Sequence, residues 1–133
     1  MANLTHLNLL YGTAYAWNLW RSDNPDVIPD LREASLTYRD LRWFDLSDAD
    51  LREANLTGAY MMQTVLSNAD LREATMFRTD LREANLRGAD LREANLGGAD
   101  LTNASLNGAD LREADMTNTI LTGADLTGAI TGD

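Results

Sequence analysis

The five-residue phrase Asp-Leu-Arg-Glu-Ala constrains this chain more than any other feature: it starts at Asp30 and returns at Asp50, Asp70, Asp90 and Asp110. Between these copies a looser pattern of Ala, then Asp or Asn, then Leu recurs every five residues. The chain therefore has two nested periods, of five and of twenty residues, and its fold must satisfy both. Repetition of this kind decides the architecture before any other feature is considered.

Each five-residue unit is centred on an apolar residue, and the centres fall at every fifth position from Leu31 to Leu126. A period of five matches neither the 3.6-residue helix nor the two-residue strand, so no continuous regular element keeps every centre inside. A mixed unit does. Ala, Asp and Leu in extended form point in, out and in, and the next two residues turn a corner. Four such sides close one coil of twenty residues.

Runs such as Ala49-Asp50-Leu51-Arg52-Glu53 resemble the pentapeptide-repeat proteins, and Trp17 to Arg21 is similar to the lead-in of many cyanobacterial members. The resemblance implies an all-β fold, a right-handed quadrilateral β-helix, here of about five coils. One coil cannot bury its own leucines, so stability is expected to come from stacking.

The repeat divides the chain into a leader with a capping helix, residues 1–29, and a pentapeptide-repeat β-helix, residues 30–133. The leader pattern predicts one helix from Thr5 to about Ser22. Its side chains Leu10, Trp17 and Trp20 are expected to cover the N-terminal end of the core.

Two features of the repeat lead to further predictions. Arg39 and Phe44 occupy inward positions where Ala is usual, which indicates a helix rather than a coil beside them. The second corner residue of the fourth side is Asp, Asn or Gly, so type II turns with positive φ are predicted there. On the first side it is always Glu, which predicts a turn without positive φ.

The repeat continues to the C-terminal end, where the core of the last coil would face water. Open sheet edges favour pairing. An end-to-end homodimer through the C-terminal coil is therefore predicted; fraying of that coil, or a further segment downstream, is the alternative.

Composition excludes several classes of function. The net charge is −10, from 21 acidic and 11 basic residues. This charge argues against direct nucleic-acid binding and against docking on an anionic membrane. No stretch is long and apolar enough to span a bilayer, and the first ten residues lack the pattern of a signal peptide, which makes the cytoplasm the expected location.

The sequence contains no recognisable catalytic, cofactor-binding or metal-binding site. It has one histidine and no cysteine, so it has neither a histidine cluster for zinc nor a Cys–His pair, and no Ser–His–Asp set stands in a plausible frame. His6 is interpreted as a solvated leader residue. We predict a non-enzymatic protein without cofactors.

The regular first side carries a stripe of acidic and basic residues. Its members are Asp30, Asp50, Asp70, Asp90, Asp110, Arg32, Arg52, Arg72, Arg92 and Arg112, with five glutamates beside them. The simple interpretation is a solvated face whose charges offset one another across levels. The alternative comes from the family resemblance: some quinolone-resistance members imitate an acidic DNA duplex and inhibit a topoisomerase such as gyrase.

A group of apolar residues interrupts the outward positions of the first three coils. Its members are Tyr38, Trp43, Tyr60, Met62, Val65 and Phe77. Exposed apolar patches usually indicate a contact. Either the leader covers this group or an unknown protein partner binds it. The preferred hypothesis is a rigid scaffold that acts as a protein-interaction module.

Overall fold

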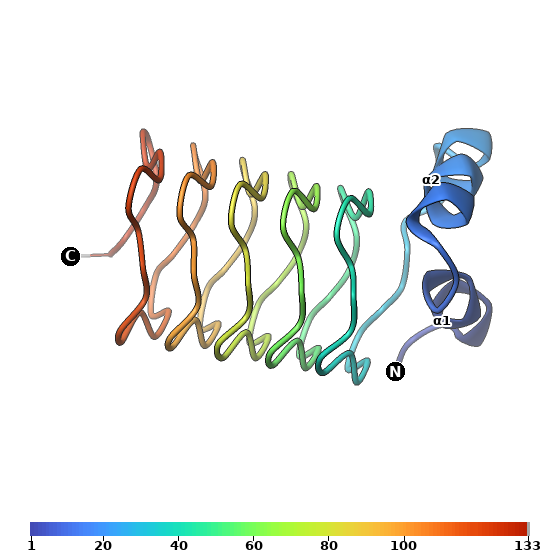
Figure 1. The fold of residues 1–133 in the computed structure, drawn as a ribbon, viewed down its shortest axis with the longest axis horizontal. Coiled ribbons are helices and arrows are strands. Elements are labelled where there is room, and N and C mark those ends of the chain that lie inside the picture. The colour runs from blue at the N-terminus through green and yellow to red at the C-terminus, as the bar shows by residue number, and fades with distance from the viewer. Residues whose placement is uncertain (133) are drawn as a thin grey trace.

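The structure, a computed structural model that describes residues 1–132, is a short rod with two helices at its N-terminal end (Figure 1). Helix α1 spans Leu4–Leu10 and helix α2 spans Ala14–Asp23. From Asp30 the chain winds into a stack of coils, and the C-terminus lies at the opposite end of the rod. Neither helix has the length and hydropathy needed to cross a membrane, in the part of the chain that is described.

The prediction of a single leader helix is wrong, because Tyr11 to Thr13 separate two shorter ones. Gly12 is a poor helix former, and the Thr13 hydroxyl accepts a hydrogen bond from the Ala16 N–H at 3.1 Å, which restarts the helix as an N-cap. Helix α1 is capped by Asn3 rather than Thr5. The Asn3 side-chain oxygen accepts from the Thr5 N–H at 2.9 Å.

The coils are joined by parallel β-bridges between residues that are twenty positions apart. One column of bridges runs from Asp30 through Asp50, Asp70 and onward to Ile130, and so defines five coils. The bridges are isolated, and residues 30–132 contain no continuous strand. The predicted stack of coils is therefore confirmed, but the continuous strands of an all-β fold are absent from residues 30–132, because two of every five residues form a corner.

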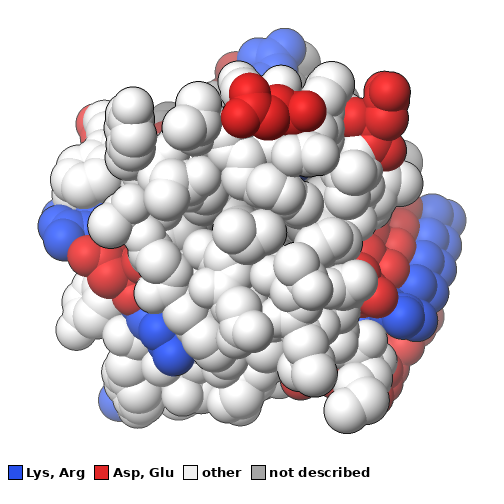
Figure 2. All heavy atoms as spheres, turned by 90° about the vertical axis from the view of Figure 1, so that its right-hand side faces the viewer, with Lys and Arg blue, Asp and Glu red and all other residues white. Residues whose placement is uncertain are grey.

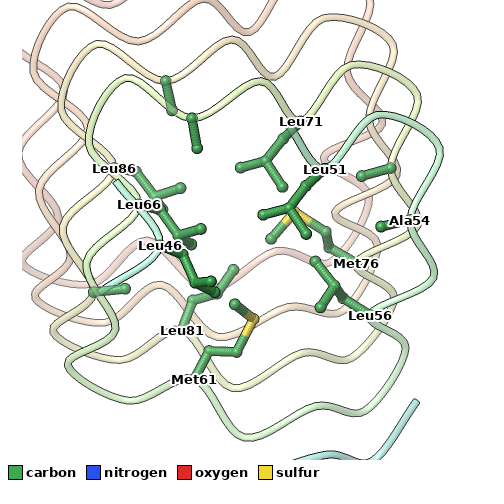
Figure 3. Close-up of a cluster of buried hydrophobic side chains, with 14 of the residues drawn as sticks. Leu46, Leu51, Ala54, Leu56, Met61, Leu66, Leu71, Met76, Leu81 and Leu86 are labelled. Atoms are coloured by element: carbon green, nitrogen blue, oxygen red, sulfur yellow. The ribbon is translucent and has the colours of Figure 1, made fainter. Parts of the chain in front are cut away.

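The unit centres form the core of the rod. From Leu31 to Leu106 every centre is fully buried, and the small residues that precede them are buried as well. Figure 3 shows Leu46, Leu66 and Leu86 piled along one wall of the interior. Each buried leucine contributes about 1.5–3 kcal/mol relative to exposure. The predicted stacking of leucines in register is confirmed.

The predicted contrast between turns is wrong, because every second corner residue from Glu33 to Gly128 has positive φ. On the first side φ is 59° at Glu53, and on the fourth it is 67° at Gly88. In both places the corner N–H donates to a carbonyl of the next coil: Glu33 to Arg52 and Gly88 to Asn107, each at 2.9 Å. Stacking therefore fixes the corner conformation, whatever the intrinsic preference of the residue.

Candidate interaction surfaces

The leader packs on the N-terminal end of the core through aromatic side chains. Leu10 and Trp17 are buried, and Trp20 is half-buried against the same cluster. The Trp17 ring lies 5.2 Å from the Trp20 ring and 6.3 Å from that of Phe44, measured between centroids. The large Phe44 is thus accommodated beside a helix, as its inward position predicted.

Hydrogen bonds from helix α2 hold the leader on the fourth side of the first coil. The Asp45 carbonyl accepts from Trp17 Nε1 at 2.7 Å and from Arg21 Nη1 at 2.8 Å, while Arg21 Nη2 donates to the Ser47 carbonyl at 2.9 Å. The Asp45 N–H donates to Asn18 Oδ1 at 2.8 Å. Side chains of the leader thus replace the backbone groups that a preceding coil would supply.

Sequence reasoning missed Arg21, which is buried, because an arginine near a helix end usually lies in solvent. The available signal was its position four residues after Trp17, on the same face of the helix.

The interpretation of His6 as a solvated residue is wrong. His6 is half-buried, its Nδ1 accepts a hydrogen bond from the Asp30 N–H at 2.9 Å, and its ring lies 5.1 Å from that of Trp20. Arg39, the other large residue at an inward position, places its guanidinium 3.8 Å from the centre of the Tyr11 ring. Both contacts bind the leader to the first coil.

The charged stripe on the first side is a ladder of bidentate ion pairs. In the second coil, Arg52 Nε and Nη2 donate to the two carboxylate oxygens of Asp50 at 2.8 and 2.7 Å. The same Arg52 reaches Asp70 in the next coil at 3.7 Å. Hydrogen bonds from Arg52 hold the pKa of Asp50 below its usual value. The corresponding arginine does the same for the pKa of Asp30, Asp90 and Asp110.

The glutamates of this side are differently placed. Only Glu33 forms an ion pair within residues 1–132, with the Met1 ammonium at 2.7 Å. Since the aspartates are neutralised by arginines, the uncompensated negative charge of the first side lies in the column of Glu53, Glu73, Glu93 and Glu113. Figure 2, which looks at the helical end, shows acidic and basic residues in separate columns receding along one edge, whereas the end itself is almost free of charge.

Two further ion pairs of the same kind lie on the third side and were missed. Arg42 pairs with Asp40 and Arg82 pairs with Asp80, each at 2.7 Å. The signal was present in the sequence, because Asp80 begins a sixth copy of Asp-Leu-Arg-Glu-Ala outside the twenty-residue series.

The apolar group of the first coils is largely uncovered. The exposed fraction is 69% for Tyr38, 54% for Trp43, 51% for Tyr60 and 40% for Phe77, while Met62 is half-buried. Helix α2 bonds to the Trp43 carbonyl through Asn18 but leaves the indole exposed. The leader therefore does not cover these side chains.

Four members of the group lie on the third side and its two corners in coils one and two, and we call them the aromatic patch: Tyr38, Trp43, Tyr60 and Met62. In the second coil Tyr60 and Met62 occupy the places that an Asp–Arg pair occupies in the first and third coils. The Tyr38 ring leans along the rod over Gly58, where an added Cβ would lie 2.4 Å from a ring carbon.

Hydrogen bonds hold one edge of the patch. Trp43 Nε1 donates to Gln63 Oε1 at 2.7 Å, and Gln63 Nε2 donates to Glu83 at 3.0 Å. The remaining two predicted members lie apart: Val65 is on the fourth side, half-buried, and Phe77 is at the corner of the second side in the third coil.

The last coil is less covered than the others. Met116, Leu121 and Leu126 are half-buried, whereas the centres of coils one to four are fully buried. The backbone N–H groups of these three residues have no acceptor among residues 1–132, although each earlier centre donates to the next coil.

Comparison with known sequences and structures gives the same architecture. The sequence model of one family, described as pentapeptide repeats, matches residues 30–68, 45–82, 59–98 and 94–130 with eight copies. The chain belongs to the pentapeptide-repeat family. No curated protein matches this pentapeptide-repeat protein in sequence.

Two solved structures of similar pentapeptide-repeat proteins cover most of the chain. Rfr23 from the cyanobacterium Cyanothece 51142 is 31% identical over 76% of this chain, with a TM-score of 0.63. A protein of the Arabidopsis thaliana thylakoid lumen is 32% identical over 74% of it, with a TM-score of 0.62. This chain covers 66% of each of them, just under two thirds. A protein from Nostoc PCC 7120 is 40% identical over 56% of this chain and 62% of its own, with a TM-score of 0.56.

Proposed function

We propose that this pentapeptide-repeat protein is a rigid, non-enzymatic scaffold, wound right-handed and resident in the cytoplasm, that binds a protein partner through the aromatic patch. The observation that supports this proposal is the exposure of Tyr38, Trp43 and Tyr60 on coils whose interior is fully packed. Each of these rings exposes half of its surface or more.

The composition of the patch is that of a binding hot spot. Tyr, Trp and Met are enriched at the centres of protein interfaces, and a few such residues carry most of the binding free energy. The Asp40–Arg42 pair, between Tyr38 and Trp43 along the chain, and the Asp80–Arg82 pair of the third coil place charged groups beside the rings. Because the hydrogen-bonded coils hold the rings in place before binding, little conformational entropy is lost on association.

The test is affinity capture from the native host with a matched pair of variants. We expect Trp43→Ser combined with Tyr60→Ser to keep the melting temperature and to lose a partner that the wild type retains. The control is Tyr15→Ser combined with Leu19→Ser, since these leader residues are exposed to 80% and 51%. A partner retained equally by both double variants contradicts the proposal.

A second candidate, an acidic duplex mimic that inhibits a topoisomerase such as gyrase, is favoured by the unpaired glutamate column of the first side. Coils about 4.8 Å apart repeat its carboxylates at a regular interval along the rod. Arginines neutralise the neighbouring aspartates, which weakens the resemblance to a polyanion. A gyrase supercoiling assay decides: inhibition that is lost on changing Glu53, Glu73 and Glu93 to Gln supports mimicry, and undisturbed supercoiling excludes it.

We further propose that a second copy closes the open core of the last coil in an end-to-end homodimer. The support is the row of N–H groups that have no acceptor among residues 1–132, at Met116, Leu121 and Leu126. Sedimentation velocity on the wild type and on Leu121→Asp tests this: a dimer that the substitution dissociates is expected. A strict monomer with an ordered last coil contradicts it.

A further inference from the structure

One corner of the rod is hollow. At the corner that follows the second side, coils one, two, three and five carry Thr-Tyr, Thr-Gly, Phe-Arg and Thr-Asn, whereas the fourth coil carries Gly97-Gly98. No other corner of the repeat consists of two glycines. At this corner lies a hollow of about 320 Å³, lined by residues of the third, fourth and fifth coils. We call it the glycine hollow.

Phe77 and Arg78 of the preceding coil line one side of this hollow. A Cβ added at Gly97 would lie 3.3 Å from a carbon of the Phe77 ring, and one added at Gly98 would lie 3.2 Å from Arg78 Cγ. The Arg78 guanidinium lies 5.1 Å from the centre of the Phe77 ring. The Phe77 ring therefore lies against Gly97, which is buried, and the exposed remainder of the ring and the Arg78 side chain line one side of the hollow.

The polar groups around the glycine hollow are only partly satisfied. The Arg78 side chain donates no hydrogen bond and forms no ion pair to any residue in 1–132, unlike most arginines of the rod. Asn95 Oδ1 accepts from the Gly97 N–H at 2.9 Å, which leaves its amide N–H groups unused. On the far wall lie Asp115 and Asn118.

Asp115 is a carboxylate at neutral pH. Its pKa is lowered by hydrogen bonds from Thr117, one of them from the backbone N–H at 3.0 Å. The hollow thus contains one guanidinium and one carboxylate that do not pair with each other. Their charges cancel, so neither an anion nor a cation is favoured as a ligand.

We propose that the glycine hollow binds a neutral saccharide. Hydroxyl groups donate and accept at once, and so match a site that offers guanidinium and amide donors beside a carboxylate acceptor. The C–H face of a sugar ring is apolar and suits the face of Phe77. Small-ligand sites combine an aromatic wall with a few convergent polar groups in this way. The proposal is independent of the protein partner proposed above.

Saturation-transfer NMR on the full chain tests the proposal with glucose, galactose, N-acetylglucosamine and cellobiose as probes. We expect at least one of these saccharides to bind with a Kd on the order of 1 mM. The backbone amide signals of Gly97, Gly98, Thr117 and Asn118 are expected to shift on titration. Phe77→Thr restores the Thr that occupies the same column in three other coils, and it should weaken binding by about tenfold or more, which corresponds to about 1.4 kcal/mol.

The control variant is Tyr15→Ser, which removes a ring that is 80% exposed on the leader and should leave the affinity unchanged. A second variant, Asp115→Asn, separates the effect of charge from that of shape: it should keep the fold and weaken saccharide binding. Three results overturn the proposal. They are the absence of binding by all four saccharides, equal binding by wild type and Phe77→Thr, and binding of zwitterionic glycine or phenylalanine in place of the saccharides.

Discussion

In coils one to four, every second corner residue except Trp43 donates its backbone N–H to a carbonyl of the coil that follows, and this bond favours the left-handed conformation of the glutamates. Glu53 has φ of 59° and donates to the Arg72 carbonyl at 3.0 Å. A non-glycine residue in this region costs about 1–2 kcal/mol. The cost is offset by a hydrogen bond that recurs at nearly every corner of the first four coils.

Gly108 isolates the backbone contribution, because an added Cβ there would meet no atom within 4 Å while φ is 70°. We expect Gly108→Ala to lower the free energy of unfolding by about 1 kcal/mol through backbone strain alone. Urea denaturation measures it. Gly108→Asn is the control, since Asn68 and Asn103 adopt the same conformation, and it should cost less than Ala. A loss that is equal for both variants contradicts this explanation.

Sequence reasoning predicted the buried leucines correctly but not the turn conformation at the glutamates. A leucine at every fifth position has one physical interpretation, whereas the preference of Glu against positive φ is only a weak bias. Hydrogen bonds between coils outweigh this preference of Glu. They could not be predicted before the pairing of the coils was known.

The leader ends the stack by imitating a coil with side chains. A lone coil would leave carbonyl groups of its first level without donors, and each such buried group costs about 1–3 kcal/mol. Trp17 and Arg21 donate to the Asp45 carbonyl, and Arg21 also donates to Ser47. The helix break at Gly12 and Thr13 orients α2 for these bonds. Its position was not predictable, because apolar spacing continues through the break.

Arg21→Leu should therefore destabilise the protein more than a surface substitution does. We expect a loss of about 1–3 kcal/mol, since the Ser47 carbonyl loses its donor and the Asp45 carbonyl keeps only that of Trp17, while the apolar contact is kept. Thermal unfolding followed by circular dichroism measures it. Arg87→Leu, at an exposed corner of the fourth side, is the matched control and should change stability by less than about 0.5 kcal/mol. Equal losses would show that Arg21 does not hold the leader.

The Asp–Arg pairs, including the two on the third side, make the stability of the fold depend on pH in the acidic range. The folded pKa of Asp40 and Asp80 lies below the usual value because of hydrogen bonds from Arg42 and Arg82. Their contribution is thus complete above the unfolded pKa, near 3.9, and is lost as pH falls through the folded value. We expect the melting temperature to fall between about pH 4 and pH 2. Arg42→Gln combined with Arg82→Gln should make that fall smaller; an unchanged pH profile contradicts the role of the pairs.

As a whole, the molecule is a rod whose interior is filled by buried side chains. Any partner or ligand must therefore bind at its corners, sides or ends. The five coils and the outward position of the aromatic residues were predictable, because the repeat assigns each position to the inside or the outside, but whether the leader covers these residues was left open. The Trp43–Gln63–Glu83 chain and the glycine hollow were not recognised from the sequence. Both features are formed by residues twenty positions apart in the sequence. Such residues are recognised as neighbours only when the sequence is aligned coil by coil at every position.

The stacking of the coils is tested most directly by the distance between two residues of one column, measured by electron paramagnetic resonance between paired spin labels. Ser35 and Asp115 end a column of bridges on the second side, four coils apart, and the chain has no cysteine to interfere. Labels on Ser35→Cys and Asp115→Cys should give one narrow distribution near about 19 Å, from four steps of about 4.8 Å. A broad distribution, or a mean far beyond that value, would contradict the stacked coil on which every surface described above depends.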